Sequence, residues 1–146
     1  MFRTLAIVAS ATLAAPALAD GHAASGDAAA GEKAFRQCIS CHVVVNDAGE
    51  TLAGRKAQTG PNLYGIAGRA AGSVEDFRYS DLIMAAGEQG IVFDEANFVA
   101  YVQDPTGWLR ETTGDSGRGK MTYKVRKESD AVDLYAYLAS LSAGGS

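Results

Sequence analysis

The sequence predicts an all-α domain in which short helices are joined by long loops. Three observations lead to this class. Apolar residues recur at the three- and four-residue spacing of a helix, most clearly over residues 134–141. Residues that commonly cap helices precede these segments. Finally, the sequence shows no strand-like alternation of any length, and many of its 17 glycines lie between the apolar stripes.

The N-terminal segment has the features of a secretory signal peptide. Arg3 supplies a positive charge, residues 5–15 are mostly apolar, and Ala17-Leu18-Ala19 fits the small-x-small cleavage pattern. A retained membrane anchor is the alternative, but the apolar run is shorter than the roughly 20 residues of a membrane-spanning helix. We therefore expect residues 1–19 to be a signal peptide, cleaved on export to the periplasm, and residues 20–146 to form one domain.

Loss of Arg3 with this segment would change the formal net charge from −4 to −5. An acidic balance argues against nucleic acid, or an anionic membrane surface, as the main partner.

Five helices are predicted after residue 20, each following a residue that can cap a helix. They are residues 28–38 after Asp27, residues 81–86 after Ser80 with Gly87 as the stop, a helix after Asp94, a helical turn from Pro105 after Asp104, and a last helix after Ser129. Residues 46–60 and 112–119 are predicted to be loops. A chain with so much loop has a modest core, which a large apolar cofactor would complete.

The C-x-x-C-H run at Cys38, Cys41 and His42 is the attachment signature of c-type haem. Two thiols one helical turn apart can form thioethers with the two vinyl groups, and the adjacent histidine can bind the iron. A zinc site would need four ligands and only His22 could complete the set. A redox C-x-x-C would need a βαβ pattern, and a plain disulfide would close a very short loop. The run predicts one covalently attached haem c per chain.

Met121 is the predicted second axial ligand. It lies in a loop without an apolar stripe, whereas Met84 lies on a short helix, where a methionine usually fills the core. His22, in the N-terminal tail, is a more remote alternative. Ligation by histidine and methionine raises the haem potential and fills both axial positions, which favours electron transfer over catalysis.

Five segments match, in order, those of a known family: A-G-E-K-A-F-R-Q-C-I-S-C-H, T-G-P-N-L-Y-G-I-A-G-R, Y-V-Q-D-P, G-K-M-T-Y and D-L-Y-A-Y-L. They cover the chain from Gly31 to Leu141, which resembles a class I cytochrome c and is most similar to the bacterial cytochrome c2 group. The resemblance implies the class I cytochrome c fold, with short helices and long loops wrapped around one covalently bound haem.

The resemblance also assigns roles around the haem. The Pro61 carbonyl would accept a hydrogen bond from His42 Nδ1–H, unless Pro61 merely forms a turn, and both can hold together. Tyr101 would point its hydroxyl toward the Met121 sulfur, or else serve as a core aromatic.

Further implied roles concern the buried haem propionate and the helix crossing. Arg69 and Tyr79 would hydrogen-bond the propionate, although Arg69 could instead be a solvated charge. Phe93 stands where the family often has a tryptophan donor, and Gly119 where mitochondrial forms have a threonine. The first helix would cross the last one at Gly31.

Basic residues gather in the two segments that flank the haem in this family. We expect a docking patch for acidic faces of membrane redox complexes, although solvated surface charge is the alternative. Its predicted residues are Arg55, Lys56, Lys120, Lys124, Arg126 and Lys127.

The sequence thus predicts a monomeric periplasmic carrier of single electrons and not an enzyme. Electrons would come from a quinol-oxidising cytochrome bc complex and go to a terminal oxidase or a photosynthetic reaction centre. A dedicated redox partner of one periplasmic dehydrogenase shares all this chemistry. A peroxidase-like haem enzyme would need an acid/base group beside Met121, and the sequence suggests none.

Overall fold

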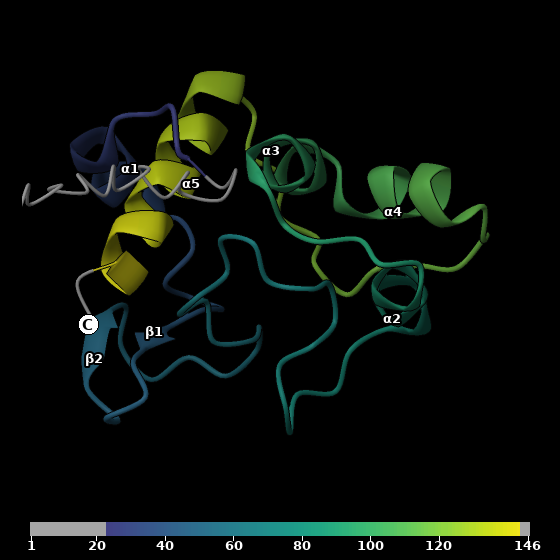
Figure 1. Cartoon of the computed structure of the whole chain (residues 1–146), viewed down its shortest axis with the longest axis horizontal. Coiled ribbons are helices and arrows are strands. Elements are labelled where there is room, and N and C mark those ends of the chain that lie inside the picture. Colours follow the sequence, from purple (N-terminus) through teal and green to yellow (C-terminus); the bar gives the residue numbers. More distant parts are fainter. Residues whose placement is uncertain (1–22, 144–146) are drawn as a thin grey trace, which may run out of the picture.

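The computed structural model describes residues 23–143 and confirms the all-α class, with one small sheet added (Figure 1). The elements are α1 (Ala28–Phe35), β1 (Val44–Val45), β2 (Thr51–Ala53), α2 (Asp81–Glu88), α3 (Glu95–Gln103), α4 (Pro105–Thr113) and α5 (Glu128–Ala143). Long irregular segments connect β2 to α2 and α4 to α5. No helix in this part of the chain combines the length and apolar character of a membrane span.

Three aspartates cap helices as predicted. Asp27 Oδ1 accepts from the backbone N–H groups of Ala29 and Ala30, at 2.8 and 3.2 Å. Asp94 accepts from Asn97 N at 2.8 Å, and Asp104 begins α4 with Pro105 at the first turn. Side-chain acceptors at these positions satisfy N–H groups that a helix leaves unpaired, so the local sequence decides where these helices start.

Other predicted boundaries were wrong by one to three residues. The prediction that Ser129 caps the last helix fails because Ala131 N already donates to Lys127 O at 3.2 Å, so the helix begins before Ser129. The first helix ends at Phe35 rather than residue 38, since Cys38 N turns back to Phe35 O at 2.8 Å. α2 continues through Gly87 to Glu88.

A short hairpin replaces part of the predicted loop over residues 46–60. β1 and β2 pair antiparallel, and Gly49, with φ 81°, allows the turn between them. The Asn46 side chain accepts from Ala48 N and Glu50 N, at 3.1 and 2.9 Å. Strands of two and three residues are too short to show alternation, so no sequence pattern predicts them.

The crossing of α1 and α5 has the predicted form. A Cβ built on Gly31 would lie 2.0 Å from Asp133 O, so no larger residue fits there without movement. The ring centroids of Phe35, on α1, and Tyr137, on α5, lie 5.7 Å apart at the same helix crossing. In Figure 1 the two helices lie side by side, which brings segments from both ends of the described chain together.

Candidate cofactor-binding site

A cavity in the interior of the fold is lined by Cys38, Cys41, His42 and Met121. Its walls come from α1, α2, α3 and α5, from the segments between α1 and α2, and from the segment around Met121. Most of the remaining lining is apolar and includes Leu63, Ile66, Ile83, Phe93, Phe98, Val102, Leu134 and Leu138. The structure thus brings the C-x-x-C-H run and Met121 to one apolar space.

Met84, one of the other two candidate axial ligands, does not share this position. Met84 is absent from the cavity lining and is 46% exposed, so the expectation that it fills the core was wrong. It lies on α2, where Leu82 and Ile83 take the buried positions instead. His22 lies outside the described residues.

His42 is held in one orientation. Its Nδ1 lies 2.9 Å from Pro61 O, and because a carbonyl can only accept, this nitrogen carries the proton and Nε2 keeps a free lone pair. Burial lowers the pKa of His42 below its ordinary 6.5, against a smaller opposing effect of the Pro61 hydrogen bond. The ring is therefore a neutral donor to a metal, as an axial ligand must be.

Gly60 completes this support, although no sequence pattern predicts a role for it. A Cβ at Gly60 would lie 2.3 Å from His42 Cε1 and 2.6 Å from its Nδ1. Gly60 N also donates to Cys41 O at 2.7 Å, which ties the two segments together. Only its place beside Pro61 in T-G-P-N could have drawn attention to it.

The two cysteines lie on a single turn that follows α1. Cys41 N and His42 N both return to Cys38 O, at 3.1 and 2.9 Å. Burial, assisted by the nearby Cys41, raises the pKa of Cys38 to about 11, so its thiol stays protonated. Within residues 23–143, no group of three or more His, Cys, Asp or Glu side chains is placed to hold a metal ion.

Two polar side chains, those of Arg69 and Tyr79, line the cavity beside its apolar wall. Arg69 donates through Nη1 to Tyr64 O at 2.8 Å and through Nη2 to Asn62 O at 3.1 Å, so it is fixed and not a solvated charge. Tyr79 Oη accepts from Val74 N at 3.3 Å and keeps its proton free to donate.

The charges of the lining match a haem. Arg69 and Lys120 are its charged residues, and no carboxylate lines it. Burial lowers the pKa of Arg69, an effect that the nearby Tyr79 opposes, which means that the cation lacks a full counter-charge. A flat apolar ring with two carboxylates would fill the apolar cavity and would also supply anions for Arg69 and Lys120.

Tyr101 joins the cavity wall to a cluster of aromatic rings. Its ring centroid lies 5.2 Å from Phe93 and 5.8 Å from Trp108. Burial, with an added contribution from Tyr79, raises the pKa of Tyr101 to about 12, so the hydroxyl remains a neutral donor. Tyr101 is thus a core aromatic that also lines the cavity, and the contact of its hydroxyl with the Met121 sulfur stays a prediction.

The predicted docking cations fall into two groups. Lys124 Nζ lies 2.7 Å from Asp104 Oδ1, and Lys120 Nζ donates to Arg78 O. Neither contact could be predicted from the sequence. Arg55, Lys56, Arg126 and Lys127 are exposed and make no ion pair within the described part of the chain. These four cations are therefore less engaged by contacts within the protein than Lys120 and Lys124 are.

Comparison with known proteins gives concordant matches. No protein-family profile matches the chain. It is 70% identical over 111 residues to cytochrome c2 of Rhodovulum adriaticum, covering 75% of this chain and 88% of the relative. It is 51% identical over 144 residues to cytochrome c2 of Cereibacter sphaeroides, covering 97% of each. Cytochrome c-551 of Roseobacter denitrificans is 51% identical over 148 residues, covering 100% of both chains.

Solved structures agree with the sequence matches. The crystal structure of cytochrome c2 from Rhodobacter sphaeroides superimposes with a TM-score of 0.78 at 54% identity, covering 80% of this chain and 96% of that one. Ferric cytochrome c-550 from Paracoccus versutus gives a TM-score of 0.75 at 44% identity, covering 81% and 99%.

Proposed function

The chain belongs to the bacterial cytochrome c2 family and is therefore an electron carrier with covalently bound haem c, and we propose that it shuttles single electrons through the periplasm. In this proposal it receives them from a quinol-oxidising cytochrome bc complex. It delivers them to a terminal oxidase or, in a photosynthetic host, to a reaction centre. The shared cavity of His42 and Met121 is the observation on which this function depends.

Four residues would hold the cofactor. Cys38 and Cys41 would form the two thioethers, and His42 and Met121 would bind the iron. The iron, once bound, stores and releases one electron. The protonated Nδ1 of His42 and its contact with Pro61 O leave Nε2 as the ligand atom, and keep the ring from turning. A fixed pair of ligands leaves little to rearrange when the charge changes.

The polar residues of the cavity would influence how readily the bound iron gains or loses its electron. Arg69 and Tyr79 would bind the buried propionate, and Tyr101 would donate its hydroxyl toward the Met121 sulfur. Arg69 is already held by two backbone carbonyls, so binding of an anion would not require a flexible side chain to become ordered. Because His42 and Met121 would both bind the iron, the protein would perform no bond-making on a substrate.

Export underlies the periplasmic location. We propose that residues 1–19, outside the described residues, are a signal peptide and that residues 20–146 are the mature single domain. Docking would use Arg55, Lys56, Arg126 and Lys127 most, with Lys120 and Lys124 contributing less. Small, charge-steered contacts of a monomer release quickly, as a shuttle between membrane complexes requires.

An optical redox titration of the holoprotein, purified after expression of the full chain, tests the proposal. The oxidised wild type should show the methionine-to-iron charge-transfer band and a high potential. Met121→Ala should lose both. Met84→Ala is the matched control, because Met84 is exposed and absent from the cavity, and it should keep both. A high-spin wild type without the band would contradict the assignment of Met121.

A further inference from the structure

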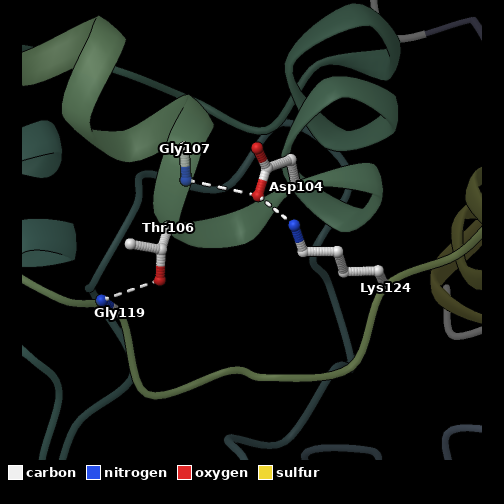
Figure 2. A network of polar contacts seen from close by, with 5 residues as sticks. All are labelled: Asp104, Thr106, Gly107, Gly119 and Lys124. Carbon is white, nitrogen blue, oxygen red and sulfur yellow. Dashed lines mark hydrogen bonds and ion pairs between the residues drawn. The ribbon is translucent and has the colours of Figure 1, made fainter.

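The segment that contains Met121 makes three contacts with one short stretch of the chain, the corner between α3 and α4. Lys120 and Tyr123 also join it to Arg78 and Gln37. We call residues 119–125 the methionine segment and residues 102–106 the corner. Figure 2 shows two of the contacts, from Thr106 to Gly119 and from Asp104 to Lys124. A third joins the two backbones, where Val125 N donates to Val102 O at 2.8 Å.

The two contacts in Figure 2 lie on either side of Met121. Gly119 N, two residues before it, donates to Thr106 Oγ1 at 3.2 Å. Lys124 Nζ, three residues after it, lies 2.7 Å from Asp104 Oδ1. The methionine segment is therefore fixed at both ends by side chains that are only two residues apart in the corner.

Asp104 is itself held in place by the start of α4. It ends α3 with φ −149° and ψ 77°, and its Oδ1 also accepts from Gly107 N at 3.4 Å. A Cβ at Gly107 would lie 2.0 Å from Asp104 Oδ2, so the carboxylate occupies space that only glycine leaves open. The carboxylate thus caps α4 and binds Lys124 from a fixed position.

The corner is also part of the cavity wall. Val102 is 5% exposed and lines the cavity, as does the neighbouring Tyr101. Gly119 approaches closely, since a Cβ there would lie 3.2 Å from Thr106 Oγ1. A displacement of the methionine segment from the corner would therefore move Met121 relative to the wall that Tyr101 belongs to.

We propose that Asp104 and Thr106 are positioning residues that keep Met121 on the iron against competing external ligands. This inference rests on the proposed ligation by Met121. The Lys124–Asp104 pair is exposed, with side chains 57% and 54% accessible, so it adds little to the global stability. The pair instead opposes local opening of the methionine segment, and an external ligand can reach the iron only after such an opening.

The experiment is a titration of the oxidised holoprotein with imidazole, followed through loss of the methionine-to-iron band. Thr106→Val keeps the shape of the side chain and removes the acceptor. Asp104→Asn keeps an oxygen for Gly107 N and removes the charge. We expect each variant to bind imidazole roughly threefold to tenfold more tightly, and the double variant more tightly than either. Thr106→Ser, which restores the hydroxyl, should return the affinity to that of wild type.

Asp115→Asn is the matched control, because it removes one exposed carboxylate from the neighbouring loop and should leave the affinity unchanged. Denaturant unfolding of the same variants separates local from global effects, and their midpoints should move much less than their imidazole affinities. Unchanged affinity in Thr106→Val and Asp104→Asn, with the band present in wild type, would overturn only the positioning role. A wild type without the band would overturn the proposed ligation and, with it, this inference.

Discussion

The backbone of Gly60 passes directly against the His42 imidazole, where a Cβ would come within 2.3 Å of Cε1. This contact and the Pro61 hydrogen bond, at 2.9 Å, act on the same ring from adjacent residues. The Gly60 contact limits how far the ring can move. The Pro61 hydrogen bond fixes the rotation of the ring and the nitrogen that carries its proton.

Gly60→Ala should displace the His42 ring from its present position. A contact of 2.3 Å cannot persist, so either the ring or the backbone of residues 60–61 must shift. We expect a weakened histidine–iron bond, visible as high-spin character in the optical and paramagnetic resonance spectra, and a loss of about 2–4 kcal/mol in the free energy of unfolding.

Gly117→Ala is the control for Gly60→Ala. A Cβ at Gly117 would meet Leu82 at 3.6 Å, an ordinary contact distance. This variant should keep the low-spin spectrum and the wild-type stability. A low-spin, fully stable Gly60→Ala protein would show that the ring has more room than the geometry indicates.

Docking should depend on the free cations more than on the engaged ones. Lys127→Ala removes an exposed charge with no ion pair within residues 23–143, while Lys124→Ala removes one that Asp104 already neutralises. We expect Lys127→Ala to slow association with a purified cytochrome bc complex about twofold to threefold at low ionic strength, and Lys124→Ala to slow it less. The measurement is the second-order rate of electron transfer as a function of salt. Equal effects of the two variants would contradict this division.

Acid should weaken the contact between the corner and the methionine segment. The hydrogen bond from Lys124 is the main cause that lowers the pKa of Asp104 below its ordinary 3.8. A carboxyl with a lowered folded-state pKa stabilises the fold fully above its unfolded value, and that contribution is lost as pH falls through the folded value. The difference in unfolding midpoint between wild type and Asp104→Asn should therefore shrink from about pH 5 downward. A constant difference down to pH 2 would exclude this carboxyl as its source.

Alkaline pH should act through Tyr101. Its pKa is raised from 10.0 to about 12, first by burial and then by Tyr79, so folding favours the neutral hydroxyl. The resulting stability is complete below pH 10 and is lost as pH rises toward 12. Tyr101→Phe should therefore lose less stability between these values than wild type, in denaturant titrations at each pH. An equally steep loss in Tyr101→Phe would assign it to other groups.

Much of the fold follows from local sequence, because a cap acts within three residues. Asp27, Asp94 and Asp104 each bind an amide two or three positions ahead, so their helices start as predicted. Gly87 shows where local reasoning fails. It resembles a helix stop, yet α2 continues through it to Glu88. A Cβ at Gly87 would lie 2.2 Å from Ala71 O. That glycine is required by a distant segment.

The candidate site shows the same division. Spacing alone identified Cys38, Cys41 and His42, and the lack of an apolar stripe identified Met121. The partners of Lys120 and Lys124 are 42 residues and 20 residues away in the chain, and no local pattern encodes such pairs. For the same reason, the exposure of Met84 could not be predicted, since it depends on which face of α2 meets the rest of the molecule.

The meeting of α1 and α5 has a consequence for the order in which the chain can fold. Gly31 contacts Asp133 across most of the described sequence, so this loop can close only after the last helix has been synthesised. Until then α1 has no partner, and an isolated helix of eight residues is not stable in water. The thiols that follow α1 would therefore stay accessible in the growing chain, and the late closure leaves time for covalent attachment before the interior forms around the cofactor.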